Sequence, residues 1–243
     1  RPVAADAEPE LADDLARLAR MPRDRSTVIH NPVITGPAPV DRAGETAAEA
    51  AWAGWTGPRI ITAGRLKGQK NHPLLLAAFA RLLQEVDARL MILGTGEREQ
   101  ALRARIAADG LGQKVILAGH VDDPGPYYRS ANLFVLSSDY EGFGNVLVEA
   151  LACGLPVVST DCPGGPAEIL EGGRYGRLVP VRDEPAMARA MVQALREPPD
   201  ADLLKARARA FAPGSLAERY LALLVPAASE AMLPWVAHPG DPG

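Results

Sequence analysis

The stretch LFVLSSDYEGFGNVLVEALACGLPVVST (residues 133–160) decides the fold of this 243-residue chain. It opens with the apolar run LFVL and passes through a polar, glycine-rich turn. A segment of helical period then starts near Gly144 and breaks at Cys153 and Gly154, before the second apolar run VVST. Two apolar runs that flank a helix are typical of a parallel β-α-β unit.

The same alternation of apolar runs and helical segments repeats from residue 59 onward. Strands are predicted at residues 60–63, 90–93, 115–118, 133–136, 157–160 and 178–181. Six strands separated by helices predict an α/β fold with a doubly wound, Rossmann-like parallel sheet. The helix after the first strand is clearly marked, because Asn71 is a good N-cap residue and Pro73 suits the first helical turn.

Composition excludes several classes of protein. The chain has 26 Lys and Arg against 30 Asp and Glu, and a net charge of −4 argues against a general nucleic-acid binder. No run approaches the roughly 20 apolar residues of a membrane span. Cys153 and Cys162 lie in no metal-binding or CxxC spacing, so neither a zinc site nor a disulfide framework is predicted, and a reducing, cytoplasmic compartment is expected.

Three turns that follow strands are the candidate binding elements, because doubly wound sheets bind ligands beyond the carboxyl ends of their strands. The first turn, GRLKGQK (residues 64–70), places Arg65 and Lys70 beside a helix N-terminus. Cations and free amides there suit an anion such as a diphosphate, although a solvated surface loop is the alternative for this turn alone. The Walker A spacing is absent.

The second turn, GTGE (residues 94–97), matches only part of the dinucleotide fingerprint. Glu99 stands where the third glycine of that fingerprint would lie. A tight turn that lines a nucleoside and a plain structural turn are both compatible with this pattern.

The third turn, SSDYEGFGN (residues 137–145), leads into a helix and carries two carboxylates, Glu141 before the helix and Glu149 within it. Its glycines let a ligand approach the backbone, and the free amides at the helix start favour an anionic group. Each carboxylate can accept hydrogen bonds from sugar hydroxyls. The alternative is that Glu141 caps the helix electrostatically while Glu149 is solvated.

The run EGFGNVLVEALACGLPVVSTDCPGGPAEIL (residues 141–170), preceded by AGRLKGQKNH (residues 63–72), closely resembles the retaining GT-B glycosyltransferases of family 4. Their signature is two glutamates separated by seven residues, as Glu141 and Glu149 are. The resemblance covers about residues 7–225. It implies the C-terminal, donor-binding half of a GT-B fold and metal-independent, retaining transfer of a hexose from a nucleotide-diphosphate sugar to an acceptor hydroxyl.

The resemblance also implies roles for individual residues. Arg65 and Lys70 correspond to the pair that neutralises the donor diphosphate, and Glu141 corresponds to the glutamate that faces the transferred sugar. Glu149 corresponds to the glutamate that holds the ribose hydroxyls. The other expected donor-binding residues are Gly142, Phe143, Gly144, Asn145, Val146, Gly94 and Val121. By the same resemblance, Gly94 and the stretch around His120 and Val121 would lie near the base. No metal and no other cofactor is expected.

The resemblance divides the chain unequally. The expected parts are residues 1–35 as a remnant of an N-terminal domain and crossover, 36–58 as a linker rich in Gly, Pro and Ala, 59–212 as the Rossmann-like domain, and 213–243 as a C-terminal helix and tail. Most of an acceptor-binding half is lacking, so the fragment is expected to bind nucleotide without transferring sugar alone. The amphipathic pattern of residues 7–21 predicts a helix that could support dimerisation.

The expected partners are a nucleotide-diphosphate sugar and a glycan or lipid-linked acceptor, with peripheral contact at the inner membrane as a family-level expectation. One alternative is a nucleotide-binding module that acts with a separate acceptor-domain partner. Another is a different GT-B enzyme, such as a sugar-nucleotide epimerase or a phosphorylase, whose catalytic groups the sequence does not place. The nucleotide, the sugar and the acceptor stay open.

Overall fold

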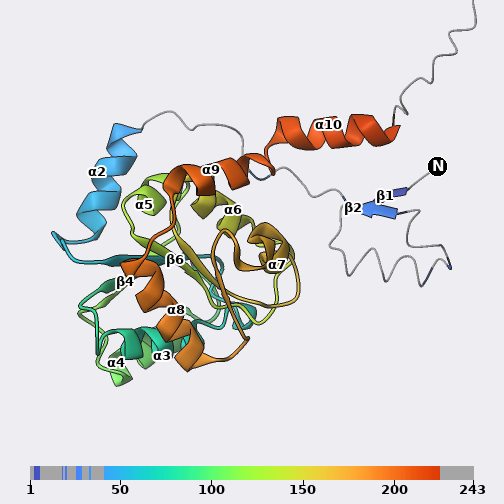
Figure 1. Ribbon diagram of the computed structural model, residues 1–243. Coiled ribbons are helices and arrows are strands. Elements are labelled where there is room, and N and C mark those ends of the chain that lie inside the picture. The colour runs from blue at the N-terminus through green and yellow to red at the C-terminus, as the bar shows by residue number, and fades with distance from the viewer. Residues whose placement is uncertain are drawn as a thin grey trace, which may run out of the picture.

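The computed structural model describes residues 3–5, 18, 20, 26–28, 33 and 41–224, and a parallel sheet with flanking helices dominates it (Figure 1). The strands of this sheet are β3 (Arg59–Ala63), β4 (Arg89–Leu93), β5 (Val115–Gly119), β6 (Leu133–Leu136), β7 (Val157–Thr160) and β8 (Arg177–Val179). All six predicted strands are therefore confirmed.

The strand order in the sheet is β5-β4-β3-β6-β7-β8, and every neighbouring pair is parallel. The chain thus winds outward from β3 through β4 and β5, then returns to β6 beside β3 and winds the other way. The doubly wound α/β fold is confirmed. This reversal places a crevice at the carboxyl ends of β3 and β6, where such sheets bind ligands.

Helices cover both faces of the sheet, because alternate residues of a strand point to opposite sides. Ile60, Ile92 and Val135 pack on one face with α3 (His72–Leu82), α4 (Glu99–Ala108) and α8 (Glu184–Arg196). Ile61, Met91 and Phe134 pack on the other with α5 (Gly125–Arg129), α6 (Asn145–Ala152), α7 (Pro166–Ile169) and α9 (Ala201–Arg209). Figure 1 shows these two helical layers. Short 3-10 turns, η2 (Gly68–Lys70) and η3 (Glu171–Gly173), and helix α10 (Pro213–Leu224) complete this part.

The segment expected to be an irregular linker, residues 36–58, contains a helix, α2 (Arg42–Ala51). Asp41 caps it by accepting a hydrogen bond from the Ala43 amide at 3.0 Å. Only Ala48 of this helix is buried. The expectation of irregular structure is wrong here, because the prolines of this segment lie outside residues 42–51 and the alanines within that range favour a helix.

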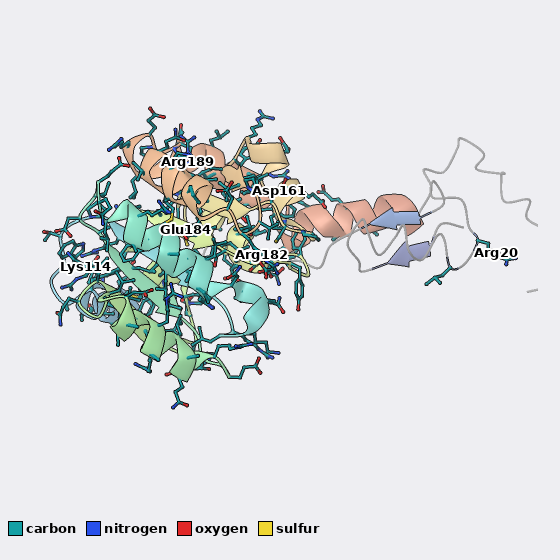
Figure 2. The ribbon with its side chains drawn as sticks, turned by 90° about the horizontal axis from the view of Figure 1, so that it is seen from below. Arg20, Lys114, Asp161, Arg182, Glu184 and Arg189 are labelled. Carbon is teal, nitrogen blue, oxygen red and sulfur yellow. The ribbon has the colours of Figure 1, made fainter. Side chains whose placement is uncertain are left out.

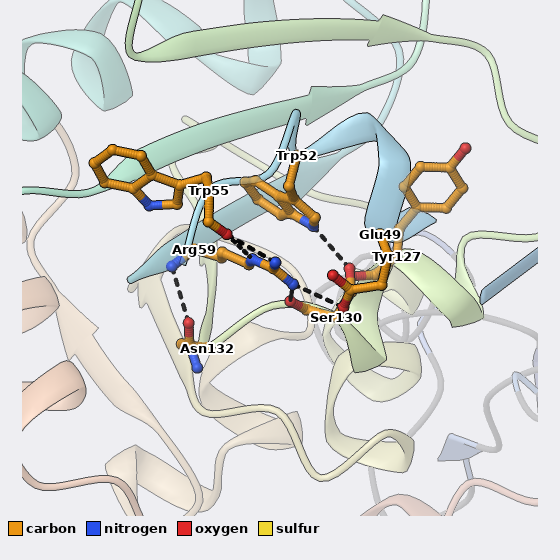
Figure 3. A network of polar contacts seen from close by, with 7 residues as sticks. All are labelled: Glu49, Trp52, Trp55, Arg59, Tyr127, Ser130 and Asn132. Carbon is orange, nitrogen blue, oxygen red and sulfur yellow. Dashed lines mark hydrogen bonds and ion pairs between the residues drawn. The ribbon is translucent and has the colours of Figure 1, made fainter. Parts of the chain in front are cut away.

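Aromatic and polar contacts join α2 to the amino end of the sheet (Figure 3). Trp52 is fully buried, and its indole Nε1 donates to Ser130 Oγ at 2.8 Å. The Arg59 guanidinium donates to Trp55 O at 2.8 Å and forms an ion pair with Glu49 at 2.8 Å. The segment that precedes β3 therefore belongs to the core of this fold, at the end of the sheet opposite the crevice.

Replacing Trp52 with alanine should lower the free energy of unfolding by about 3–5 kcal/mol, because it leaves a large buried cavity and removes the partner of Ser130. Urea denaturation of the Trp52→Ala and Thr56→Ala variants measures this effect. Thr56 is exposed, so its variant should match the wild type. An unchanged midpoint for Trp52→Ala would contradict the packing of α2.

The described residues near the N-terminus include a small sheet that the sequence did not predict. In it β1 (Val3–Ala5) pairs in parallel with β2 (Ser26–Val28). The helix predicted over residues 7–21, and the dimer contact that depends on it, lie outside the described residues except for Leu18 and Arg20. Among the described helices, none has the length and apolar character needed to cross a bilayer.

Candidate functional site

A cavity of about 450 Å³ lies at the carboxyl ends of β3 and β4, beside the amino end of α6. Its walls come from turns that are far apart in the sequence and that the sheet brings together. Five of the predicted site residues line it, namely Arg65, Gly94, Val121, Val146 and Glu149. His120, expected near the base, lines it as well. The fold thus assembles a large part of the predicted site around one cavity.

Glu149 lies half-buried on α6 and has a hydrogen-bond donor that the sequence did not reveal. The Tyr128 hydroxyl donates to Glu149 Oε2 at 3.1 Å, and the Tyr128 side chain is buried. Burial raises the pKa of the Glu149 carboxyl, the Tyr128 hydrogen bond lowers it, and the charge of Asp123 raises it again. The alternative of a solvated Glu149 is therefore wrong. No sequence signal marks Tyr128, since its contact depends on how α5 packs beside α6.

Lys70 and Glu141 form a buried ion pair next to this cavity. Lys70 Nζ lies 2.7 Å from Glu141 Oε1, and the two side chains are 14% and 6% exposed. Ser138 Oγ donates to the same carboxylate oxygen. Glu141 is not the N-cap residue of α6, because Gly144 occupies that position, and its charge is paired with Lys70. The predicted catalytic residues Lys70 and Glu141 are thus brought together, outside the cavity wall.

The Lys70 side chain nevertheless lies directly behind the cavity. A Cβ atom added to Gly64 would come within 2.9 Å of Lys70 Cε, and Gly64 lines the cavity. Arg65, the next residue, is exposed and also lines the cavity. Two cations of the predicted diphosphate-binding turn therefore lie next to Gly64, a residue of the cavity wall.

The turn that carries Lys70 is held by the turn that carries Glu141. Ser137 Oγ donates to Lys70 O at 2.8 Å, and the Asp139 amide donates to Gln69 O at 2.8 Å. Asn71 Nδ2 donates to Asp139 Oδ1 at 2.9 Å. These bonds fix the position of Lys70 against the loop before α6.

Asn71 is confirmed as the N-cap of α3, since its side chain accepts from the Leu74 amide at 3.3 Å. Its backbone is left-handed, with φ of 44°. Arg182 also has a left-handed backbone, with φ of 63°, and donates to Asp139 at 2.9 Å. Figure 2 labels Arg182, which precedes the start of α8 in the sequence by two residues. The hydrogen bond from Arg182 is the main cause that lowers the pKa of Asp139, burial opposes it, and the Asn71 bond adds to it.

The glycines of the second turn allow its backbone to lie close to the backbone of the first turn, which follows β3. A Cβ atom on Gly94 would lie 2.0 Å from Gly64 O, and φ at Gly94 is +126°. A Cβ atom on Gly96 would lie 2.6 Å from Leu66 O. The plain structural reading of this turn is thus supported, and Gly94 lines the cavity at the same time.

The remaining predicted donor-binding residues, Gly142, Phe143, Gly144 and Asn145, form the loop and first turn of α6. Phe143 packs against Phe211 at 5.6 Å between ring centroids. The helix starts where it was predicted, with Gly144 as N-cap at φ of +92°. Because Val146 in the first turn of α6 lines the cavity, the positive end of this eight-residue helix borders it.

A second pair of glycines supports this loop and was missed by the sequence reasoning. A Cβ atom on Gly164 would lie 2.2 Å from Glu141 O, and one on Gly165 would lie 2.1 Å from Phe143 O. The Glu141 amide donates to Pro163 O at 2.9 Å. The Gly-Gly pair before Pro166 was a readable signal of close backbone contact.

In the described part of the chain, no group of three or more His, Cys, Asp or Glu is arranged to hold a metal ion.

Residues 57–197 match the sequence profile of the family Glycosyl transferases group 1. The chain belongs to this family. It is 39% identical over 138 residues to the N-acetylgalactosamine-N,N'-diacetylbacillosaminyl-diphospho-undecaprenol 4-alpha-N-acetylgalactosaminyltransferase of Campylobacter jejuni. That alignment covers 57% of this chain and 37% of the Campylobacter protein, so this group 1 chain spans well under half the length of that relative.

Solved glycosyltransferase structures share the fold. A glycosyltransferase from Rickettsia africae superposes with a TM-score of 0.78 at 19% identity, over 92% of this chain and 62% of that one. Anabaena HepE, solved in complex with UDP, gives a TM-score of 0.74 at 20% identity, over 92% and 63%. At these identities the likeness establishes the Rossmann-like architecture of the group 1 chain.

Proposed function

We propose that this group 1 glycosyl transferase chain binds a nucleotide-diphosphate sugar and provides the donor site for retaining, metal-independent transfer of a hexose to an acceptor hydroxyl. The cavity between the turns after β3 and β4 carries this proposal, because it joins the Arg65 cation, the Glu149 carboxylate and the amino end of α6. A volume of about 450 Å³ lies in the range of roughly 300–1,000 Å³ typical of small-molecule sites. The UDP complex of a protein of the same fold, Anabaena HepE, supports the ligand class.

The proposed chemistry assigns charge stabilisation to the chain itself. Arg65, Lys70 and the amides of α6 stabilise the negative charge that grows on the leaving diphosphate. Glu149 accepts hydrogen bonds from the ribose hydroxyls, and Glu141 faces the transferred sugar. The bond between the sugar C1 and the phosphate oxygen breaks, the acceptor oxygen bonds to C1 on the same face, and its proton moves to the leaving phosphate.

Lys70 has two roles in this proposal. Without donor its ammonium neutralises Glu141 at 2.7 Å. With donor bound it turns toward the phosphate across Gly64, beside which its side chain already packs. A diphosphate gives this buried cation a second anionic partner, and Arg65 and the amides of α6 meet the additional negative charge.

The test is calorimetric titration of the chain with UDP, GDP and ADP, repeated on Glu149→Gln. We expect one nucleotide to be preferred and its affinity to fall about tenfold or more in the variant, because a charged acceptor of the ribose hydroxyls is lost. Binding of none of the three nucleotides by the wild type would overturn the proposed function. Glu97→Gln is the control, since Glu97 is exposed and lies outside the walls of this cavity.

Stability separates loss of the site from loss of the fold in this test. Folding raises the pKa of the Glu149 carboxyl. As pH rises, this carboxyl therefore ionises in the unfolded chain before it ionises in the folded one. The free energy of unfolding falls over this pH range and stops falling once the folded carboxyl has ionised too. The loss of stability caused by the buried Glu149 charge is absent at low pH and fully present at neutral pH. Glu149→Gln should therefore melt higher than the wild type at pH 7 and alike below pH ~3.5, while its nucleotide affinity falls.

A further inference from the structure

We propose that Tyr128 is a positioning residue that sets the preference of Glu149 for a ribose over a deoxyribose. The proposal rests on the proposed function, in which Glu149 receives the sugar of a nucleotide. Tyr128 and Glu149 line the same cavity, and the Tyr128 hydroxyl donates to Glu149 Oε2 at 3.1 Å. No motif in the sequence points to this tyrosine.

The Tyr128 ring is held on several sides, so its hydroxyl has a fixed place. Its side chain is only 1% exposed. The ring meets Phe134 of β6 edge to face, with centroids 5.5 Å apart and planes at 90°. The Tyr128 amide donates to Pro124 O at 2.9 Å, which anchors the start of α5. A donor fixed in this way orients the carboxylate that it contacts.

The surrounding charges keep the direction of this hydrogen bond constant. Burial raises the pKa of the Tyr128 hydroxyl, and the Glu149 charge and hydrogen bond raise it further, as do Cys153 at the C-cap of α6 and Asp123 of the loop before α5. The hydroxyl therefore remains protonated and donates. The same bond favours the ionised form of Glu149, against the burial that disfavours it.

This arrangement leaves Oε1 and the second lone pair of Oε2 to accept hydrogen bonds from a ligand. Tyr128 occupies Oε2, and within the described part of the chain Oε1 accepts no hydrogen bond. A ribose presents two neighbouring hydroxyl donors to this edge, whereas a 2′-deoxyribose presents one. Without the Tyr128 hydroxyl the Glu149 carboxylate is free to rotate. It is then no longer oriented toward the 2′-hydroxyl of the ribose, so this hydroxyl should add less to the binding affinity.

The experiment measures the affinities of UDP and 2′-deoxy-UDP for the wild type and for Tyr128→Phe, with GDP or ADP and its 2′-deoxy form in place of the uridine pair where the base preference requires it. We expect the wild type to prefer the ribonucleotide about tenfold. In Tyr128→Phe the ratio of the UDP affinity to the 2′-deoxy-UDP affinity should fall to about twofold or less, mostly because the ribonucleotide binds more weakly. A partly unfolded variant would lower both affinities by the same factor and leave the ratio unchanged.

A pH series gives a second measurement. Without the Tyr128 bond the pKa of Glu149 should rise further, so ribonucleotide affinity should be lost at a higher pH on acidification than in the wild type. Tyr127→Phe is the matched control, because Tyr127 is the neighbouring tyrosine on α5 and does not line the cavity. Its nucleotide ratio and pH profile should match those of the wild type.

The outcomes separate the two proposals. A wild-type preference that persists in Tyr128→Phe would overturn the positioning role while leaving the proposed function intact. A wild type that binds both nucleotides equally would overturn the assignment of Glu149 to the ribose, and the role of Tyr128 with it.

Discussion

Replacing Gly94 with alanine should lower the free energy of unfolding by about 3–5 kcal/mol. The added Cβ would lie 2.0 Å from Gly64 O, and backbone cannot yield as a flexible side-chain end does. Gly94 also has φ of +126°, a conformation that costs other residues of order 1–3 kcal/mol. Overpacking adds roughly 1–3 kcal/mol. Because Gly64 and Gly94 both line the cavity, nucleotide affinity should fall as well.

Substitutions at two other glycines separate the cost of a positive φ from the cost of the steric clash. Gly119 has φ of +76° with no atom within 4 Å of an added Cβ, so Gly119→Ala should show the backbone cost alone, about 1–2 kcal/mol. Gly112 has open space and no positive φ, so Gly112→Ala should be neutral or slightly stabilising. Urea denaturation of the three variants gives the series. Equal midpoints for Gly94→Ala and Gly119→Ala would show that the turns after β3 and β4 do not approach as closely as described.

The second large effect is expected at Lys70. Lys70→Met leaves the Glu141 carboxylate, whose side chain is 6% exposed, without its cation, and a broken buried pair costs about 3–5 kcal/mol. Adding Glu141→Gln should recover more than half of this loss, since an amide carbonyl can still accept from Ser138. Arg103→Met, which breaks an exposed pair with Glu99, is the control and should cost less than about 0.5 kcal/mol.

The same substitution tests the contact with phosphate. Lys70→Met should weaken UDP binding about 10- to 100-fold, because a charge-assisted hydrogen bond to the diphosphate is lost. Uridine, which carries no phosphate, should bind the variant and the wild type alike. Calorimetry at a temperature where both proteins are folded makes the comparison. Unchanged UDP affinity would show that Lys70 serves only to balance Glu141.

The fold could be predicted because its signal is local and repeated. The four central strands, β3, β4, β6 and β7, are short, largely apolar runs buried on both faces, and each turn contains glycine or polar residues that end the strand. The helix over residues 42–51 was missed because the Gly, Pro and Ala content of residues 36–58 indicates a linker. Its attachment depends on Trp52, which reaches Ser130 across the fold, and no local periodicity records such a contact.

The candidate site could be predicted in part. Arg65, Gly94, Val146 and Glu149 could be predicted to lie near one another because strand ends of a parallel sheet meet at one edge, whereas Val121 was implied only by the resemblance; all five line the cavity. The pairing of Lys70 with Glu141 could not be deduced, because it depends on contacts between two turns that lie 71 residues apart in the sequence. Tyr128, Gly164 and Gly165 were missed because their contacts join turns that only the winding of the chain makes adjacent.

The sequence by itself determined the alternation of strands and helices, the places where turns break them and the residue types offered at the carboxyl edge. These properties depend on patterns within a few residues, which burial and backbone sterics impose directly. Only the tertiary structure decided which charges meet, which glycines are required and which hydroxyl holds Glu149. Those outcomes depend on distances of a few ångströms between residues far apart in the sequence, such as Lys70 and Glu141 with a separation of 71, and a linear pattern does not contain such distances.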